Sequence, residues 1–375
     1  MWRLIFLLCS CTPCELPIDD APPSCELGGN GPSPPGVVIA HRYASTKEYL
    51  SSPTILRAPD GALVSTHDVP GHLPPTRPTL VYRSEDDGLT WMNVASINWL
   101  VFASLFEHEG KLYLLGTAGA YADVVLAESS DSGRTWTRLV ILKGSFATGT
   151  TPVAKYDGRL WHAIEVAPQP VVWPSSFQAA MISAPLNSDL LDQTNWQISD
   201  VKIFQSDLGD GWLEGNAVVT PHGVADLLRV DVFKAPEHAA IVDVHSPSKM
   251  GEAKFFKMDG GASKFVVRFD PTTKRYLALL NTMKGEDVKP NFVRNHLVLA
   301  SSTDLKEWKY HCTVLDNPDR FHHSFHYADW QVDGDDLIFV SRTSYDDDEG
   351  GADSFHNSNF ITFHRLSRYR RFVFR

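Results

Sequence analysis

The chain has 375 residues, of which 43% are hydrophobic and 11% aromatic, so it can bury a large core. Its formal net charge is −11 at pH 7 and its repeated segments contain no basic block, which argues against nucleic acid or an anionic membrane as a partner. An anionic ligand would therefore have to be held by a local cluster of cations. The 25 glycines and 24 prolines suit a protein built from many turns.

The N-terminal segment is similar to a secretory signal. A short apolar run over residues 4–9 follows Met-Trp-Arg, and it is too short to span a bilayer. We expect a signal over residues 1–16, a linker rich in Pro, Gly and Ser over residues 17–36, and one domain over residues 37–375. The protein is accordingly expected to be extracellular.

The cysteines are concentrated at the N-terminus. Cys9, Cys11, Cys14 and Cys25 lie in the leader, and only Cys312 lies in the body of the chain. Because the body keeps a single cysteine, the sequence predicts a fold that does not depend on disulfides.

One turn motif occurs twice, and the two copies begin 45 residues apart, at Ser84 and Ser129. The motif is Ser-x-Asp-x-Gly-x-Thr-Trp, and it covers residues 84–91 and 129–136, with weaker copies further along the chain. We expect a β-hairpin turn in which the Asp accepts backbone N–H groups, the Gly takes a positive φ and the Trp packs over the turn. A fixed period of this size indicates a repeat architecture.

The rest of the chain repeats a unit of four strands, without competing helical periodicity. Six turns join a first strand to a second strand, at residues 59–61, 107–110, 156–158, 221–223, 270–273 and 332–334. The sequence therefore predicts an all-β propeller of six blades. Residues 37–41 are expected to be the fourth strand of the last blade and to close the ring.

Polar residues stand where second strands end and first strands begin, and in a propeller these positions converge on one rim. The rim residues from second strands are His67, Asp68, Thr117, His162, Glu165, Arg229, Asn281 and Arg342. First strands and nearby loops contribute Glu214, Asn216, His323, Tyr327, Tyr121 and Arg294. We expect the working face to be this rim rather than the face with the repeated turns.

These residue types suit an acidic oligosaccharide. Arg binds carboxylates bidentately, aromatic rings stack on sugars, and His, Tyr or Glu can move protons. Polar rims are common in propellers, so the ensemble carries more weight than any one residue. We interpret the acidic run at residues 346–349 as a solvated loop, and we expect neither a metal nor a cofactor.

The repeated turn resembles the Asp-box of the bacterial neuraminidase repeat, and residues 45–366 resemble the sialidase superfamily. Gly-Trp-Leu-Glu-Gly-Asn at 211–216, Leu-Arg-Val-Asp at 228–231 and Ser-Arg-Thr at 341–343 resemble secreted sialidase-like propellers near glycoside hydrolase family 145 and polysaccharide lyase family 42. That resemblance implies action on rhamnose α-1,4-linked to glucuronate. It also implies seven blades, so a seventh blade stays possible.

Two departures from these families limit what the resemblance implies. Aligning the Arg-Ile-Pro of sialidases on Pro53 places Ser51 where the carboxylate-binding Arg would be, so exo-α-sialidase activity ranks below uronate chemistry. Lyase members carry a Tyr and an Arg where this chain has Phe146 and His162. A lyase would therefore need Tyr121 or Tyr327 instead.

Three kinds of function stay open. In elimination, Arg229 and Arg342 would neutralise a uronate carboxylate, with Asn216 as a further donor. His162 and Arg294 are also expected to bind substrate. His67 or His323 would be the base, and Tyr327 or Tyr121 the acid.

Our preferred hypothesis is this elimination reaction on a rhamnose-capped glucuronate. We expect the protein to be a monomer. Hydrolysis would instead use Glu214 with Asp68 or Glu165, and a lectin without catalysis is the third possibility.

Overall fold

The computed structural model describes residue 25 and residues 27–70, 78–232, 236–283 and 288–374. Strands dominate these ranges, whose helical segments are η1 (Ala44–Thr46), η2 (Gln193–Asn195), η3 (Pro290–Phe292) and α1 (Arg370–Val373). The all-β prediction is confirmed. Within the described ranges, no helix is long and apolar enough to cross a membrane.

Four of the sheets contain four antiparallel strands each. The first contains β2 (Ser51–Arg57), β3 (Leu63–Asp68), β4 (Thr79–Ser84) and β5 (Met92–Ile97). The next two contain β15 (Gly211–Thr220), β16 (Gly223–Asp231), β17 (His238–Ser246) and β18 (Lys249–Lys257), and β19 (Val266–Asp270), β20 (Arg275–Asn281), β21 (His296–Ser302) and β22 (Trp308–Asp316). The last contains β23 (Ser324–Asp333), β24 (Asp336–Ser344), β25 (Phe360–Leu366) and β1 (Val37–His41).

The fifth sheet contains nine strands. They are β6 (Val101–His108), β7 (Lys111–Thr117), β8 (Ala122–Ser129), β9 (Leu139–Ala147), β10 (Ala154–Tyr156), β11 (Arg159–Val166), β12 (Gln178–Pro185), β13 (Gln197–Ile198) and β14 (Lys202–Ile203). Two residue pairs between β9 and β11, Ala147 with Glu165 and Phe146 with Val166, join the groups β6–β9 and β10–β14. The described chain therefore forms five sheets, where the sequence predicted six separate ones.

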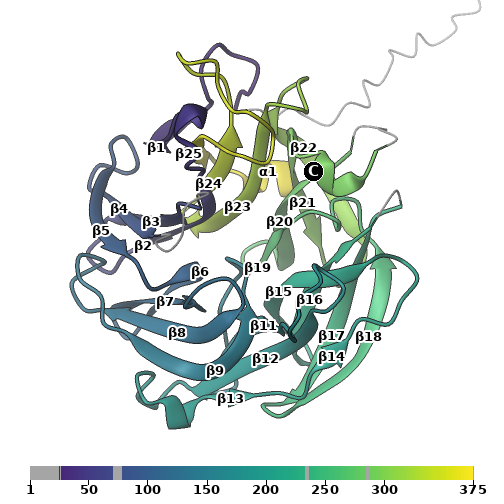
Figure 1. The fold of residues 1–375 in the computed structure, drawn as a ribbon. Helices are drawn as coiled ribbons and strands as arrows, with labels where there is room; N and C mark the ends of the chain where they lie inside the picture. Colours follow the sequence, from purple (N-terminus) through teal and green to yellow (C-terminus); the bar gives the residue numbers. More distant parts are fainter. Residues whose placement is uncertain (1–24, 26, 71–77, 233–235, 284–287, 375) are drawn as a thin grey trace, which may run out of the picture.

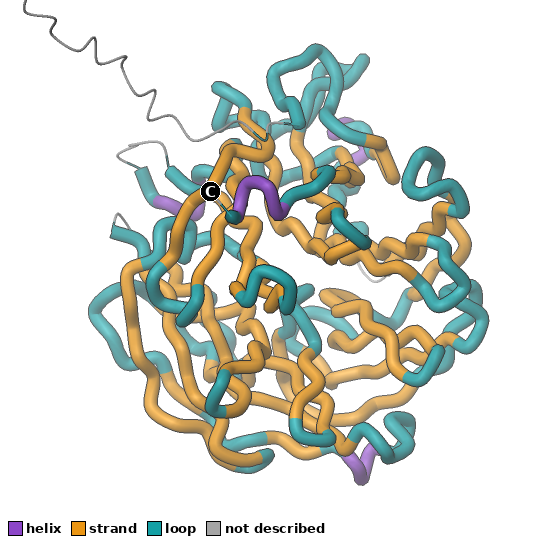
Figure 2. Tube along the Cα trace, turned by 180° about the vertical axis from the view of Figure 1, so that it is seen from behind, coloured by secondary structure: helices purple, strands orange, loops and turns teal. Residues whose placement is uncertain are grey.

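The sheets stand around a common centre, as Figure 1 shows. Near that centre β2 contacts both β6 and β23, and β15 contacts both β11 and β19. Figure 2 shows the same arrangement from behind, with α1 close to the C-terminus. The arrangement is that of a β-propeller, in which first strands meet around the axis.

The last sheet takes its outer strand from the N-terminal part of the chain. β1 pairs with β25 in antiparallel fashion, with Val38 opposite Thr362 and Ala40 opposite Ile361. The prediction that residues 37–41 complete this sheet is confirmed.

The two copies of the turn motif have the predicted geometry. Ser84 Oγ accepts the Gly88 N–H at 2.8 Å, Asp86 accepts the Thr90 N–H at 2.8 Å, and Trp91 Nε1 donates to the Gly88 carbonyl at 3.1 Å. Gly88 has φ of +94°, as does Gly133 in the second copy, so both glycines take the left-handed backbone that other residues rarely adopt.

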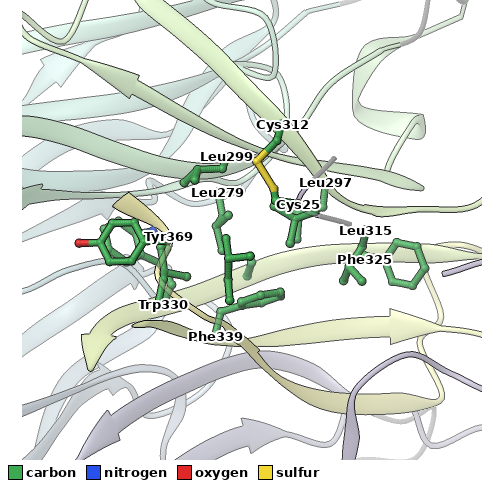
Figure 3. Packing of buried hydrophobic residues seen from close by; sticks show 14 of the residues in the cluster. Cys25, Leu279, Leu297, Leu299, Cys312, Leu315, Phe325, Trp330, Phe339 and Tyr369 are labelled. Carbon is green, nitrogen blue, oxygen red and sulfur yellow. A yellow bond between two sulfur atoms is a disulfide. The ribbon is translucent and has the colours of Figure 1, made fainter. Parts of the chain in front are cut away.

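The structure contains a disulfide that the sequence analysis did not expect. Cys25 and Cys312 are joined by a disulfide that links the N-terminal segment to β22 (Figure 3). Leu27 donates its N–H to the Val314 carbonyl at 2.8 Å, and the Tyr345 hydroxyl donates to the Gly29 carbonyl at 2.7 Å. This part of the predicted linker is therefore tied to the body. The predicted signal and Cys9, Cys11 and Cys14 lie outside the described residues.

Candidate active site

A cavity of about 630 Å³ opens among the first strands and their loops. Six of the ten side chains predicted for the site line it, namely Tyr121, Glu214, Arg229, Arg294, Tyr327 and Arg342. Glu165, at the end of β11, lines it as well. The structure thus brings together the carboxylate, tyrosine and arginine groups of the predicted rim.

Bulges in the first strands place several of these side chains. The strand register shifts between Leu213 and Asn216 in β15 and between His326 and Asp329 in β23. Within these shifts Glu214 has φ of +57° and Tyr327 has φ of +53°. A bulge next to an active site re-aims a side chain, and non-glycine residues adopt such backbone only where the surroundings impose it. Both residues line the cavity.

The same device recurs in two other first strands. The register of β2 shifts between Ser51 and Thr54, and that of β6 shifts between Val101 and Ser104. Ser52 and Phe102 lie within these shifts, each has φ of +54°, and each lines the cavity. Each of the four inner strands β2, β6, β15 and β23 therefore contains a bulge, and each bulge places one side chain at the cavity.

Tyr327, Glu214 and Arg229 form a hydrogen-bonded chain. The Tyr327 hydroxyl donates to Glu214 Oε1 at 2.6 Å, and Arg229 Nη1 donates to Glu214 Oε2 at 2.8 Å. Burial alone would raise the pKa of Glu214, but the Arg229 charge and the Tyr327 hydrogen bond hold it below its ordinary value. Burial and the Glu214 charge raise the pKa of Tyr327. The pair is thus a neutral phenol bonded to an ionised carboxylate.

Arg294 and Arg342 are buried cations beside this pair. Their guanidinium carbons each lie 5.5 Å from the centre of the Tyr327 ring. Arg294 Nε donates to the Asn291 carbonyl, and Arg342 Nη2 donates to the His356 carbonyl. Among the described residues, neither guanidinium has a carboxylate within 4.0 Å. Burial without such a partner lowers the pKa of Arg342 to about 10, so both cations favour an anionic ligand.

Glu165 is the second carboxyl group at the cavity. Its Oε1 accepts the Gly215 N–H at 3.1 Å, and the side chain is almost fully buried. Burial, helped by the charge of Glu214, raises the pKa of Glu165 to about 8. Two carboxyl groups whose environments move their pKa values apart are suited to acid and base roles. Glu165 carries a proton at neutral pH and Glu214 does not.

Four predicted residues lie away from the cavity, and the two predicted bases are among them. His67 is fully buried in β3, stacked on Tyr82 at 5.4 Å, and burial lowers its pKa to about 4. His323 lines another cavity of about 710 Å³, where its Nε2 lies 3.3 Å from Asp346 Oδ1. Neither histidine lines the cavity that contains Tyr327, so the structure does not bring the two predicted bases to that space.

His162 and Asn216 also do not reach the ligand space. His162 is buried in β11, and burial lowers its pKa to about 4. Asn216 is fully buried and spans the β15 bulge, since its Nδ2 donates to the carbonyls of Glu214 and Phe265 and its Oδ1 accepts the Val267 N–H. These bonds hold the backbone on either side of Glu214, and Asn216 does not line the cavity.

Several lining residues lie outside the strands, at positions that the sequence analysis did not single out. Trp173 is 48% exposed and Phe292 is 54% exposed, and both lie at the cavity with Phe355 and Lys289. No strand pattern marks these positions, although an exposed Trp in a loop is a general signal of binding. Within the described ranges, no group of three His, Cys, Asp or Glu side chains is arranged to hold a metal.

No family model matches this chain, and no curated protein matches it by sequence. Solved structures do match its fold. A Hadza microbial sialidase, Hz136, matches with a TM-score of 0.60 and 15% identity, over 89% of this chain and 68% of its own. A Penicillium chrysogenum α-L-arabinanase, complexed with arabinobiose, matches with a TM-score of 0.58 and 15% identity, over 88% of this chain and 98% of its own.

A third match is the Trypanosoma rangeli sialidase in complex with the inhibitor DANA. Its TM-score is 0.57 at 14% identity, and the match covers 85% of this chain and 55% of that chain. The chain therefore shares its β-propeller fold with these two sialidases and this arabinanase. At these identities the likeness concerns the fold alone.

Proposed function

We propose that this protein is a glycoside hydrolase that removes a terminal sugar carrying a carboxylate from a glycan. The observation that carries the proposal is the pair of buried guanidiniums, Arg294 and Arg342, beside the Tyr327–Glu214 hydrogen bond. Guanidinium groups bind carboxylates through parallel N–H bonds, and buried arginines without an acidic partner favour an anion. The structural neighbours named as sialidases and arabinanases support a carbohydrate-active enzyme.

The chemistry follows from the protonation states. Glu165 gives its proton to the glycosidic oxygen while Tyr327 attacks the anomeric carbon and passes its own proton to Glu214. Water then attacks the anomeric carbon and breaks its bond to the Tyr327 oxygen. Glu165 takes a proton from that water, and Glu214 returns its proton to the Tyr327 oxygen, so both groups recover their starting state. Both oxygens of Glu214 already accept hydrogen bonds, so Tyr327 is the better nucleophile. A neutral phenol also avoids the repulsion that a carboxylate would meet at an anionic sugar.

A second candidate is cleavage of rhamnose α-1,4-linked to glucuronate, in which the carboxylate belongs to the second sugar. A cavity of about 630 Å³ has room for more than one sugar ring, and the sequence resemblance favours this linkage. We propose hydrolysis rather than elimination for it, because the two histidines expected as bases lie away from the cavity.

The experiment is a substrate panel with product analysis by mass spectrometry. It contains methylumbelliferyl glycosides of sialic acid, glucuronic acid and arabinofuranose, and a rhamnosyl-glucuronate oligosaccharide. We expect turnover of an acidic substrate with addition of water. We also expect a loss of about 10-fold to 100-fold in kcat/KM in Arg294→Met and Arg342→Met. Arg159→Met, at a partly exposed position at the start of β11 and away from the cavity, is the control.

Three results would contradict the proposal. Turnover of the neutral arabinofuranoside alone would remove the role of the arginines. A 4,5-unsaturated uronate product would show a lyase. Saturable binding of an acidic glycan without turnover over days would show a lectin.

We also propose that the protein is secreted, monomeric and six-bladed. The disulfide between Cys25 and Cys312 supports an oxidising compartment. The nine-stranded sheet contains two successive groups, β6–β9 and β10–β14, and counting each as a blade gives six. Light scattering after gel filtration tests the monomer, and detection of the protein in culture medium tests secretion.

A further inference from the structure

Lys264 is a buried cation that the proposed reaction does not use. It precedes β19, does not line the cavity, and is only 2% exposed. Its Nζ has no hydrogen-bond partner in the described chain and lies 5.7 Å from the centre of the Tyr327 ring. A buried ammonium without a partner costs free energy of folding, because it loses its hydration shell.

The nearby carboxylate of Asp329 does not form an ion pair with Lys264. Asp329 Oδ1 lies 2.8 Å from Arg268 Nη2, and Asp329 Oδ2 accepts the Ile55 N–H at 3.0 Å. Asp329 is thus already engaged by another cation and by the backbone. The charged and titratable groups facing Lys264 are Asp329, Arg268, Glu214 and Tyr327.

We propose that Lys264 is a positioning residue that assists Arg229 in keeping Glu214 ionised and stabilises the negative charge developing on Tyr327 during attack. The inference rests on the proposed function. A cation over an aromatic ring is attracted to its π-electrons, and the attraction grows as the phenol loses its proton. Lys264 lies outside the cavity lining, so it acts through Tyr327 and Glu214 rather than on the substrate.

The four cations near the Tyr327–Glu214 pair have two different roles in the proposed reaction. A bound carboxylate neutralises Arg294 and Arg342, so these two no longer support the Tyr327–Glu214 pair. Arg229 and Lys264 are then the cations that still face it. In agreement with this, the Lys264 charge contributes to the lowered pKa of Glu214. Burial lowers the pKa of Lys264 itself to about 8, so it is charged at neutral pH.

The test compares Lys264→Met, which removes the charge, with Lys264→Arg, which keeps it, and with Lys143→Met at an exposed position as the control. Carbon-13 NMR of the glutamate carboxyl groups, with Glu214→Gln to assign the signal, follows the titration of Glu214 without any substrate. We expect the Glu214 midpoint to rise in Lys264→Met and to stay in place in Lys264→Arg. Arg229, Tyr327 and Glu165 also face Glu214 and are unchanged in all variants.

Thermal unfolding separates this role from a purely structural one, because loss of a packing residue would lower the Tm. A lysine whose folded pKa lies near 8 and whose unfolded pKa is 10.5 destabilises the fold below pH 8. This cost disappears as the pH rises from 8 to 10.5. At pH 6, Lys264→Met is therefore expected to have a higher Tm than the wild type. Above pH 10.5, the two proteins are expected to have the same Tm.

With a substrate identified by the panel above, Lys264→Met is expected to lower kcat about tenfold with little change in KM. A lower Tm together with an unmoved Glu214 midpoint would overturn the inference and leave Lys264 a packing residue. If the wild type turns over no glycan, the proposed function fails, but the NMR titration still decides whether Lys264 controls the charge of Glu214. If Lys264→Met does not fold, an unshifted midpoint in Lys264→Gln overturns the inference.

Discussion

At the scale of single residues, Glu165 is one of the buried acids that make the stability of the fold depend on pH. Its pKa of about 8 in the folded protein lies above its ordinary value of 4.5. Between pH 4.5 and pH 8, Glu165 is therefore protonated in the folded state and ionised in the unfolded state. Stability from this group is present below pH 4.5 and is lost as the pH rises to 8. We expect the fall in Tm between pH 5 and pH 9 to be smaller in Glu165→Gln than in the wild type.

The same variant tests the acid role. Glu165→Gln is expected to lower kcat about 100-fold or more for natural glycosides. The loss should be smaller for a substrate whose leaving group needs no proton. An equal loss for both kinds of substrate would show that Glu165 is not the proton donor.

The two kinds of arginine at the cavity predict opposite effects on stability. Arg229→Met leaves the buried carboxylate of Glu214 without its ion pair, which is expected to cost about 3–5 kcal/mol of unfolding free energy. Arg342→Met removes a buried cation that has no carboxylate partner among the described residues, so the fold is expected to keep or gain stability. Urea unfolding of both variants measures the contrast. Equal destabilisation would mean that Arg342 is a structural residue.

At the scale of elements, the β15 bulge depends on Asn216. Its side chain bonds the carbonyls of Glu214 and Phe265 and the N–H of Val267. Asn216→Ala leaves these buried groups unpaired and is expected to cost about 1–3 kcal/mol. Because the bulge sets the direction of Glu214, kcat should fall more than the stability loss alone explains. Full activity in a destabilised Asn216→Ala would contradict this role.

The bulges also explain which parts of the site could be predicted. The positions at strand ends include Glu214, Arg229, Tyr327 and Arg342, and these four line one cavity. A sequence does not show a register shift, so it could not separate Tyr327, which a bulge turns toward the cavity, from His67, which regular β3 turns into the core. Trp173, Phe292 and Phe355 were missed for a different reason, because they lie outside the strands and follow no periodic pattern.

At the scale of the whole molecule, the period of 45 residues and the turn chemistry were sufficient to predict a propeller. They could not predict the link between Cys25 and Cys312, because a disulfide between such distant positions depends on how the fold places the N-terminal segment against β22. This link closes a loop of nearly the whole domain. Cys25→Ser is expected to cost about 2–4 kcal/mol. A reductant should lower the Tm of the wild type and leave that of Cys25→Ser unchanged, whereas an equal effect on both would contradict the bond's contribution.

The most direct test of the central claim is covalent trapping. The protein is incubated with fluorinated acidic sugars, 2,3-difluorosialic acid and a 5-fluoro-glucuronosyl fluoride, and peptide mapping by mass spectrometry locates any adduct. The Tyr327–Glu214 geometry predicts one sugar attached to the Tyr327 oxygen, with none in Tyr327→Phe and a slower reaction in Arg342→Met. A sugar attached to Glu214, or turnover of acidic glycosides that leaves Tyr327 unlabelled, would contradict the account.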